Sequence, residues 1–260
     1  MKTGRASRIA LALLLAFLYA PVAVLVVYSF NDARFGAAWE GFTLRWYARL
    51  LDSPETVAAL QNTLVVSLSA TLLATLLGTL LALGLWLRRF PGRGVAQLLI
   101  LLPIVAPDIL LGVALLAFYV AVHLPLGRLS IVLAHVAFQI SFVVLVVQGR
   151  LQSFPRTLIE AARDLGAGEA AAVRHVVLPL LRPAVLAGAL LALALSIDDF
   201  LVTYFTAGAG ASTLPLRIYS MVKRGVTPDV NALSTLLLLA SLAATAAALR
   251  LRRAGPERGR

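Results

Sequence analysis

The 260-residue sequence is 60% hydrophobic and only 13% charged, whereas soluble domains are about half apolar and about a quarter charged. This composition excludes an ordinary water-soluble enzyme. The formal net charge of +11 comes from basic residues that lie between long apolar runs, so it indicates orientation in a bilayer rather than nucleic-acid binding. The chain has no cysteine, which excludes disulfides, thiolate nucleophiles and zinc–cysteine sites.

Six stretches are long enough to cross a membrane, because a helix needs about 20 apolar residues to span the hydrocarbon core. The first run follows basic residues, as a signal peptide does, but it continues to about Tyr28 without a small-residue cleavage site. A retained anchor is therefore favoured over a cleaved signal. We predict an all-α membrane protein with spans at about 9–28, 57–87, 95–122, 129–148, 183–206 and 230–249.

The distribution of basic residues predicts the orientation. With the N-terminus inside, the inner segments hold 16 Lys and Arg residues and the outer loops hold 7, and such an excess marks the cytoplasmic side. Both termini are therefore predicted to be cytoplasmic. The expected organisation is an N-terminal segment 1–8, a six-span domain 9–249 that includes a long cytoplasmic loop 149–182, and a basic tail 250–260.

Several kinds of active site are missing from the sequence. A phosphate-binding loop, G-x-x-x-x-G-K-[ST], is absent, and neither Lys2 nor Lys223 follows such a loop, so the chain is not predicted to be an ATPase or another enzyme. His123, His135 and His175 lack metal-ligand spacing and are expected to be packed or solvated, so no metal is expected. Four glycines are expected to serve close helix packing rather than ligand binding, namely Gly78, Gly84, Gly112 and Gly188.

The long inner loop contains an amphipathic segment. Its apolar residues recur at helical spacing, which predicts a short helix from Pro155 to about Leu165 that stops at Gly166. A second helical stretch, 170–177, is expected to end at Pro179, just before the fifth span. The first helix presents an apolar ridge that nothing in this chain is expected to cover, and such a ridge implies a partner subunit. The ridge consists of Leu158, Ala161, Ala162 and Leu165.

The same loop resembles the EAA loop of permease subunits of bacterial ABC importers. The match consists of Glu160-Ala161-Ala162, then Gly166, then Leu178-Pro179 at the family's spacing. In that family the loop forms a coupling helix that docks on the ATP-binding subunit. The resemblance therefore implies a coupling role for these residues. Glu169 is expected to organise the loop or to pair with Arg163 or Arg174.

Over essentially its whole length the chain resembles PotC-type permease subunits of spermidine/putrescine importers. The resemblance implies the type I ABC importer (MetI-like) fold. Departures include Phe200, Tyr204 and the stretch 208–210. The matching motifs are Ser29-Phe30-Asn31, Arg34-Phe35-Gly36, Trp39-x-Gly41-Phe42-Thr43, Trp46-Tyr47, Pro107-Asp108-Ile109, Leu195-Ser196-x-Asp198-Asp199, Leu214-Pro215-Leu216-x-Ile218-Tyr219-Ser220-Met221-Val222-Lys223 and Asn231-Ala232.

The resemblance also implies partners and a location. A second permease subunit would complete a heterodimer around the path, two copies of an ATP-binding subunit would bind ATP and magnesium, and a periplasmic binding protein would deliver a polyamine. This chain itself would hold no cofactor. It would lie in lipid as a multi-pass protein of the bacterial inner membrane.

Three aspartates lie within the predicted spans, and each would cost about 2.5 to 3.5 kcal/mol if it faced lipid at mid-bilayer. They are therefore expected to face protein or water. Counted along the helices, the first of which is expected to kink at Pro103 and Pro107, Asp108 and Asp198 lie at a similar depth of about 20 to 22 Å from the inner surface, which suits a path for a cation. Because Ser196 and Asp199 share one face of an ideal helix while Asp198 points about 100° away, at most one of the aspartate pair can point straight into the path.

Two alternatives stay open for these side chains. Asp198 and Asp199 could be structural, bonded to helix backbone or to a partner's basic residue. Trp46, near the outer mouth, could offer a ring face to a cation or could anchor the chain at the membrane interface. The candidate path residues are Trp46, Asp108, Ser196, Asp198 and Asp199.

Other functions also remain possible at this point. A permease for another solute, such as an opine, thiamine or ferric iron, would share the EAA loop. A self-contained secondary cation transporter or channel would explain the aspartates but not the ridge on the loop. A membrane scaffold without transport activity would explain the ridge but not the aspartates.

Overall fold

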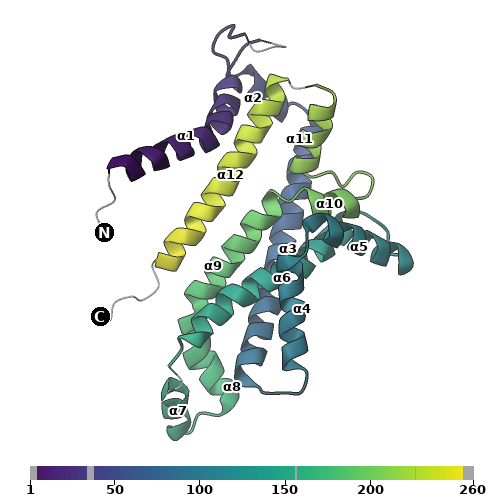
Figure 1. The fold of residues 1–260 in the computed structure, drawn as a ribbon. Coiled ribbons are helices and arrows are strands. Elements are labelled where there is room, and N and C mark those ends of the chain that lie inside the picture. The colour runs from purple at the N-terminus through teal and green to yellow at the C-terminus, as the bar shows by residue number, and fades with distance from the viewer. Residues whose placement is uncertain (1–4, 34–37, 156, 226, 254–260) are drawn as a thin grey trace.

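The computed structural model describes residues 5–33, 38–155, 157–225 and 227–253. This part of the chain is almost entirely helical, with a single isolated bridge between Asn31 and Phe42, so the expected all-α fold is confirmed (Figure 1). The N-terminal segment 1–4, the predicted motif residues Arg34, Phe35 and Gly36, and the tail beyond residue 253 lie outside the described residues. The helices are α1 (Arg5–Tyr28), α2 (Arg45–Leu51), α3 (Pro54–Leu87), α4 (Arg93–Val105), α5 (Asp108–Ala121), α6 (Arg128–Gln152), α7 (Thr157–Asp164), α8 (Glu169–Ala172), a π-helical turn (Val173–Val177), α9 (Leu178–Ile197), α10 (Leu201–Thr206), α11 (Leu214–Lys223) and α12 (Pro228–Arg253).

Five helical stretches of the described chain are long and apolar enough to cross a membrane, and the count becomes six if the α4–α5 pair forms one span. These two helices meet at an angle of 113°, so the expectation of one continuous span over 95–122 is wrong. The break lies at Ala106 and Pro107, which are both extended. Proline has no N–H for a helical hydrogen bond and disfavours a helical residue before it, which explains why the helix ends there.

The predicted fifth span is also not a single helix. Its helix begins at Glu169, since α8, the π-helical turn and α9 are continuous to Ile197. The expected stop at Pro179 is wrong, because the helix continues through this proline, which follows directly after the π-helical turn. At the other end, the chain leaves the helix at Asp198 and resumes at Leu201 as α10.

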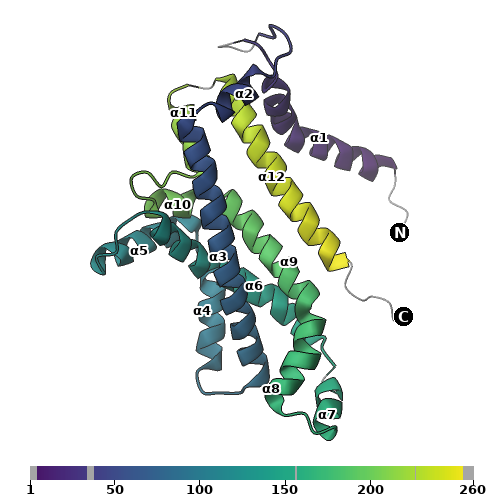
Figure 2. The same cartoon turned by 180° about the vertical axis from the view of Figure 1, so that it is seen from behind.

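The core forms where α3, α6 and α9 cross (Figures 1 and 2). Val143 of α6 is fully buried between two glycines, Gly78 of α3 and Gly188 of α9. A Cβ atom on Gly78 would lie 2.8 Å from the Cβ of Val143, so the expected packing role of Gly78 is confirmed. At Gly112 a Cβ would lie 2.8 Å from the ring of Phe205, but at Gly84 it would meet nothing within 4 Å. The packing role expected for Gly84 is therefore not found in this chain.

The contrast between two glycines of α3 gives a stability prediction. Gly78→Ala is expected to lower the free energy of unfolding by about 1 to 3 kcal/mol, because overpacking forces α6 away from α3. Gly84→Ala is the matched control and is expected to be neutral or stabilising by up to about 1 kcal/mol, because alanine favours the helix. Thermal unfolding of the purified protein in detergent measures both. Equal effects of the two substitutions would contradict the packing role of Gly78.

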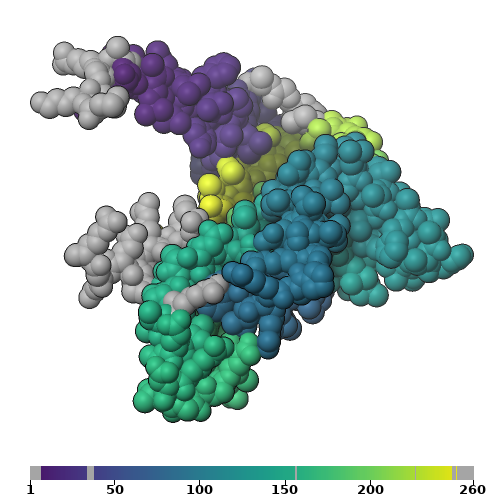
Figure 3. Space-filling model, turned by 60° about the horizontal axis from the view of Figure 1, so that its bottom comes forward, coloured from purple at the N-terminus to yellow at the C-terminus, as the bar shows by residue number. Residues whose placement is uncertain are grey.

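Helix α1 stands apart from the rest of the molecule. It contacts α12 near one end and otherwise projects outward, as Figure 3 shows from the side that carries α7. None of its most apolar window is buried within this chain. Such an apolar surface requires lipid or another protein chain around it.

Candidate solute path and coupling loop

A pocket of about 420 Å³ brings together all three predicted membrane aspartates. It lies at the two places where helices are interrupted, the α4–α5 bend and the gap between α9 and α10. Apolar and aromatic side chains complete its wall. The lining residues are Pro103, Asp108, Phe138, Phe142, Leu195, Asp198, Asp199, Phe200, Leu201 and Val202.

Two of the aspartates are exposed in this pocket. Asp108 is the first residue of α5, where the positive end of the helix dipole favours a carboxylate. Asp198 follows the last turn of α9 and is likewise exposed. Within the described residues no Lys, Arg or His lies within 4.0 Å of either carboxylate. The pocket therefore presents two acidic groups without a basic partner among the described residues.

Asp199 is held by protein groups instead. Its Oδ2 accepts hydrogen bonds from the backbone N–H of Thr203 at 2.8 Å and from the Thr203 hydroxyl at 2.7 Å. Nε2 of His135 lies 3.2 Å from the same oxygen, and the Asp199 side chain is only 10% exposed. The carboxylate thus caps the start of α10 and ties it to α6. Asp199 fits the structural alternative, in which one member of the pair bonds helix backbone.

His135 is the centre of this network. It is 1% exposed on α6, which confirms the expectation of a packed histidine. Its Nδ1 lies 2.7 Å from Ser196 Oγ, and its Nε2 lies 2.9 Å from Thr203 Oγ1. A ring with its proton on Nε2 donates to Thr203 and accepts at Nδ1 from Ser196, so every polar atom of the ring has a partner.

The expectation that Ser196 and Asp199 share one face of a helix is wrong, because the helix ends at Ile197, between the two residues. The two side chains are connected through His135 rather than through a common helix face. Ser196 is 5% exposed and does not line the pocket. Ser196 therefore supports the pocket through His135 and is not part of its surface in this structure.

Trp46 does not line the aspartate pocket. It is 3% exposed and packs in a cluster with residues of α11 and α12, which include Leu214 and Leu233. Its indole N–H donates to the backbone oxygen of Asn31 at 2.7 Å, and the guanidinium of Arg45 lies 4.5 Å from its ring centroid. This burial leaves no face of the Trp46 ring open in the structure to a solute or to lipid.

The aromatic surface near the aspartates is a different one. Phe200 lines the pocket, and its ring centroid lies 4.8 Å from that of Tyr219 on α11 and 5.6 Å from that of Tyr204 on α10. The ammonium of Lys223 lies 4.6 Å from the Tyr219 ring centroid, and its interaction with Tyr219 raises the pKa of Lys223. We call Phe200, Tyr204 and Tyr219 the aromatic cluster. From the sequence, Phe200 and Tyr204 stood out only as departures from relatives. The position of Phe200 directly after Asp198 and Asp199 could have indicated an aromatic side chain at the pocket.

The long loop forms the predicted helix, α7, at the opposite end of the molecule from α2 and α11 (Figure 1). Ile159 and the partly buried Ala162 pack against the core, while Leu158 and Ala161 are exposed. Leu165, directly after the helix, is 90% exposed. The turn at Gly166 has a φ of +86°, which favours glycine there. The described part of the chain therefore leaves the ridge uncovered, except at Ala162.

Three other residues of the loop motif have identifiable surroundings. Glu169 pairs with Arg88, which follows α3, at 3.0 Å, so the expected pairing with Arg163 or Arg174 is wrong. Leu178 and Pro179 line a separate groove between α3 and α9. Glu160 is exposed on α7. In the described part of the chain no group of three or more His, Asp or Glu residues could hold a metal ion.

The sequence of this chain matches a known family over most of its length. Residues 57–254 match the family described as "Binding-protein-dependent transport system inner membrane component". The chain belongs to this family. It is a membrane permease subunit of the ABC transporter type, a class of subunit that is not itself an enzyme.

Named relatives are similar over nearly the whole chain. The "Spermidine/putrescine transport system permease protein PotC" of Escherichia coli (strain K12) is 40% identical over 227 residues, which cover 87% of this chain and 86% of the relative. PotC of Haemophilus influenzae is 39% identical over 88% of this chain and 89% of the relative. The "Putrescine transport system permease protein PotI" of Escherichia coli (strain K12) is 39% identical over 85% and 82% of the two chains.

Solved structures support the fold. A chain of a bacterial alginate ABC transporter, in complex with a periplasmic protein bound to an alginate pentasaccharide, aligns with a TM-score of 0.73 at 18% identity and covers 96% of this chain and 93% of that one. A chain of the MetNI methionine ABC transporter in inward-facing conformations aligns with a TM-score of 0.63 at 24% identity, covering 77% and 96%. The fold is that of type I ABC importer permeases.

Proposed function

We propose that this chain is a permease subunit of an ATP-driven importer for polyamines such as spermidine and putrescine. The observation that carries the proposal is the pocket in which Asp108 and Asp198 lack a basic partner among the described residues. Identity of about 40% to PotC supports the same solute class.

The chemistry of the pocket suits an alkyl diamine or triamine. Each ammonium group that leaves water needs new acceptors, and two separated carboxylates can provide them for two charges on one flexible chain. The methylene segments between the charges can contact the apolar wall, which includes Phe138 and Leu195. The aromatic cluster offers ring faces that attract cations. A transport site must also release its solute. A site with two exposed carboxylates binds a cation less tightly than a fully enclosed site does, which favours release.

The α7 end is proposed to be cytoplasmic, in agreement with the excess of basic residues on that side. There the exposed ridge around Leu158 and Leu165 would dock on an ATP-binding subunit, two copies of which would hold the ATP and magnesium. ATP binding would draw the loops of this chain and of a second permease together and open the path outward, and hydrolysis would reset it. A periplasmic binding protein would deliver the solute to the end that carries α2 and α11, in a bacterial inner membrane.

Uptake into right-side-out vesicles, loaded with ATP or left without it, tests the proposal. A complete system, with a second permease, an ATP-binding subunit and a periplasmic binding protein, is expected to accumulate radiolabelled spermidine or putrescine only when ATP is supplied. Unlabelled thiamine or ferric iron is expected not to compete. ATP-independent accumulation by this chain alone would support a secondary transporter instead, and accumulation of another solute without polyamine uptake would refute the proposed solute class.

The ridge on the α7 loop gives a prediction about coupling. Leu165→Ser is expected to lower retention of the ATP-binding subunit during purification about tenfold, since a central apolar interface residue contributes about 1 to 2 kcal/mol. The unfolding temperature of the permease itself should not change, because Leu165 is 90% exposed. Leu51→Ser is the control, since Leu51 is 71% exposed at the opposite end of the molecule. Equal retention for both variants would rule out Leu165 as a docking contact.

A further inference from the structure

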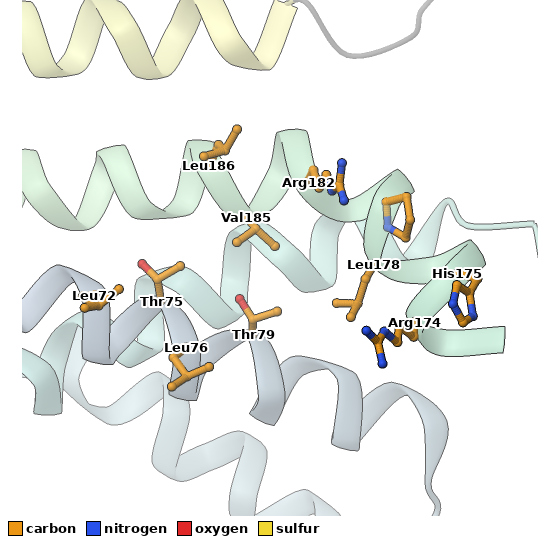
Figure 4. A pocket seen from close by; sticks show the side chains of 11 residues that line it. Leu72, Thr75, Leu76, Thr79, Arg174, His175, Leu178, Arg182, Val185 and Leu186 are labelled. Carbon is orange, nitrogen blue, oxygen red and sulfur yellow. The ribbon is translucent and has the colours of Figure 1, made fainter. Parts of the chain in front are cut away.

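A second, larger cavity lies outside the aspartate pocket. It is a groove of about 880 Å³ between α3 and α9, and it shares no lining residue with that pocket. Figure 4 shows that side chains of both helices face it. We call it the α3–α9 groove, and it is lined by Leu72, Thr75, Leu76, Thr79, Arg174, His175, Leu178, Pro179, Arg182, Val185 and Leu186.

The polar and apolar side chains are separated along this groove. Arg174, His175 and Arg182 gather at one end, and Leu72 and Leu76 lie at the other (Figure 4). The two arginines are exposed, and within the described residues no carboxylate lies within 4.0 Å of either guanidinium. The nearby Glu169 is engaged by Arg88 instead, so the basic end of the groove keeps its positive charge.

The position of the groove on α3 places its two ends at different depths. Thr79 lies about 12 Å and Leu72 about 22 Å from the end of α3 at Leu87, at about 1.5 Å per residue. The groove therefore runs from the basic residues near the α7 end toward the middle of the bilayer. A ligand that fits it has an anionic group at the membrane surface and an apolar chain that extends inward. A free anion would leave the apolar floor empty, and an apolar helix would leave the cations without a partner.

We propose that the α3–α9 groove binds an anionic glycerophospholipid of the cytoplasmic leaflet. The phosphate contacts Arg174 and Arg182, and an acyl chain lies along Leu72, Leu76 and Leu186. Arginine forms forked, charge-assisted hydrogen bonds with phosphate oxygens, and basic pockets between membrane helices on the cytoplasmic side suit anionic headgroups. The assignment to this leaflet rests on the orientation given under the proposed function. The bound lipid would join α9, which ends beside the aspartate pocket, to α3.

Lipid retention by the purified importer complex tests this site. Native mass spectrometry after addition of phosphatidylglycerol or phosphatidylcholine is expected to show preferential retention of phosphatidylglycerol. The double variant Arg174→Gln/Arg182→Gln should retain roughly 25-fold less, because each basic residue near an anionic headgroup contributes about fivefold. Arg89→Gln/Arg93→Gln is the matched control, since these two residues follow α3 at the same end but do not line the groove. Leu76→Trp, which fills the apolar floor, should also reduce retention.

Several results would overturn the proposal. Equal retention of phosphatidylglycerol by the wild type, the double variant and Leu76→Trp would exclude the groove as the site. Displacement by inorganic phosphate at equal concentration would indicate a plain anion site. Cross-linking from Leu186→Cys, in a chain with no other cysteine, to the second permease together with absence of bound lipid would show that a protein helix fills the groove. Polyamine uptake by the same preparations reports on the proposed function separately, since it does not depend on which lipid is retained.

Discussion

Asp198→Asn is expected to raise the KM for spermidine uptake by about 10- to 100-fold, because it removes a charge-assisted hydrogen bond to an ammonium group worth about 1.5 to 3 kcal/mol. Asp108→Asn should have an effect of similar size, since both carboxylates are exposed in the same pocket and have no basic partner among the described residues. Neither substitution is expected to change the unfolding temperature. Initial uptake rates over a range of spermidine concentrations give the KM.

Asp199→Asn should behave in the opposite way. Its Oδ2 already accepts two hydrogen bonds from Thr203 and lies beside His135, so the substitution is expected to lower stability by about 1 to 3 kcal/mol while the KM changes less than for Asp198→Asn. Asp52→Asn, at the exposed end of α2, controls for the loss of one acidic residue. An unchanged KM in both Asp108→Asn and Asp198→Asn would remove the carboxylates from the path.

His135→Asn is expected to lower the free energy of unfolding by about 2 to 4 kcal/mol. Asparagine is too short to contact Ser196 and Thr203 together. The substitution also removes the imidazole beside Asp199, so this buried carboxylate is left with fewer partners. Because this network ties α6 to the break between α9 and α10, uptake should fall as well. Thermal unfolding in detergent, followed by the tryptophan fluorescence of the purified protein, gives the change in stability.

His123→Asn is the matched control for this prediction. His123 is exposed and has a φ of +55°, a conformation that asparagine tolerates. It should leave both stability and uptake unchanged. A second variant, Thr203→Val, removes one partner of both His135 and Asp199 and should lower stability in the same direction. Full stability of His135→Asn would show that the network does not hold α10 in place.

The segments that cross the membrane could be predicted from the sequence because their signal is local. Whether a run of apolar residues is long enough to span the hydrocarbon core depends only on that run and not on the rest of the fold. The amphipathic helix in the long loop was predictable for the same reason, since the spacing of Leu158, Ala161 and Leu165 fixes which side chains share a helix face. Proline also signals locally, although the sequence indicated only kinks at Pro103 and Pro107 and not the 113° bend between α4 and α5.

The candidate site was predictable only in part. The cost of a charge in lipid showed that the aspartates must avoid it, and the structure places all three at one pocket. Asp199 is bonded within the protein because it lies beside His135, and Asp198 is not. His135 and its other partner Ser196 are 61 residues apart in the sequence, so this contact could not be predicted from local spacing. The burial of Trp46 and the pairing of Glu169 with Arg88 are likewise contacts between distant segments.

The sequence by itself therefore determined that this chain is a membrane protein with carboxylates in its spans and an amphipathic helix in a long loop, and its resemblance to known permeases implied the function. Apolar length, basic charge and helical spacing act over a few residues and do not depend on the rest of the fold. Only the tertiary structure decided that Asp108 and Asp198 face the pocket while Asp199 is bonded within the protein. That division depends on how α6 packs against the break between α9 and α10, because a hydrogen bond forms only where folding brings donor and acceptor within about 3 Å.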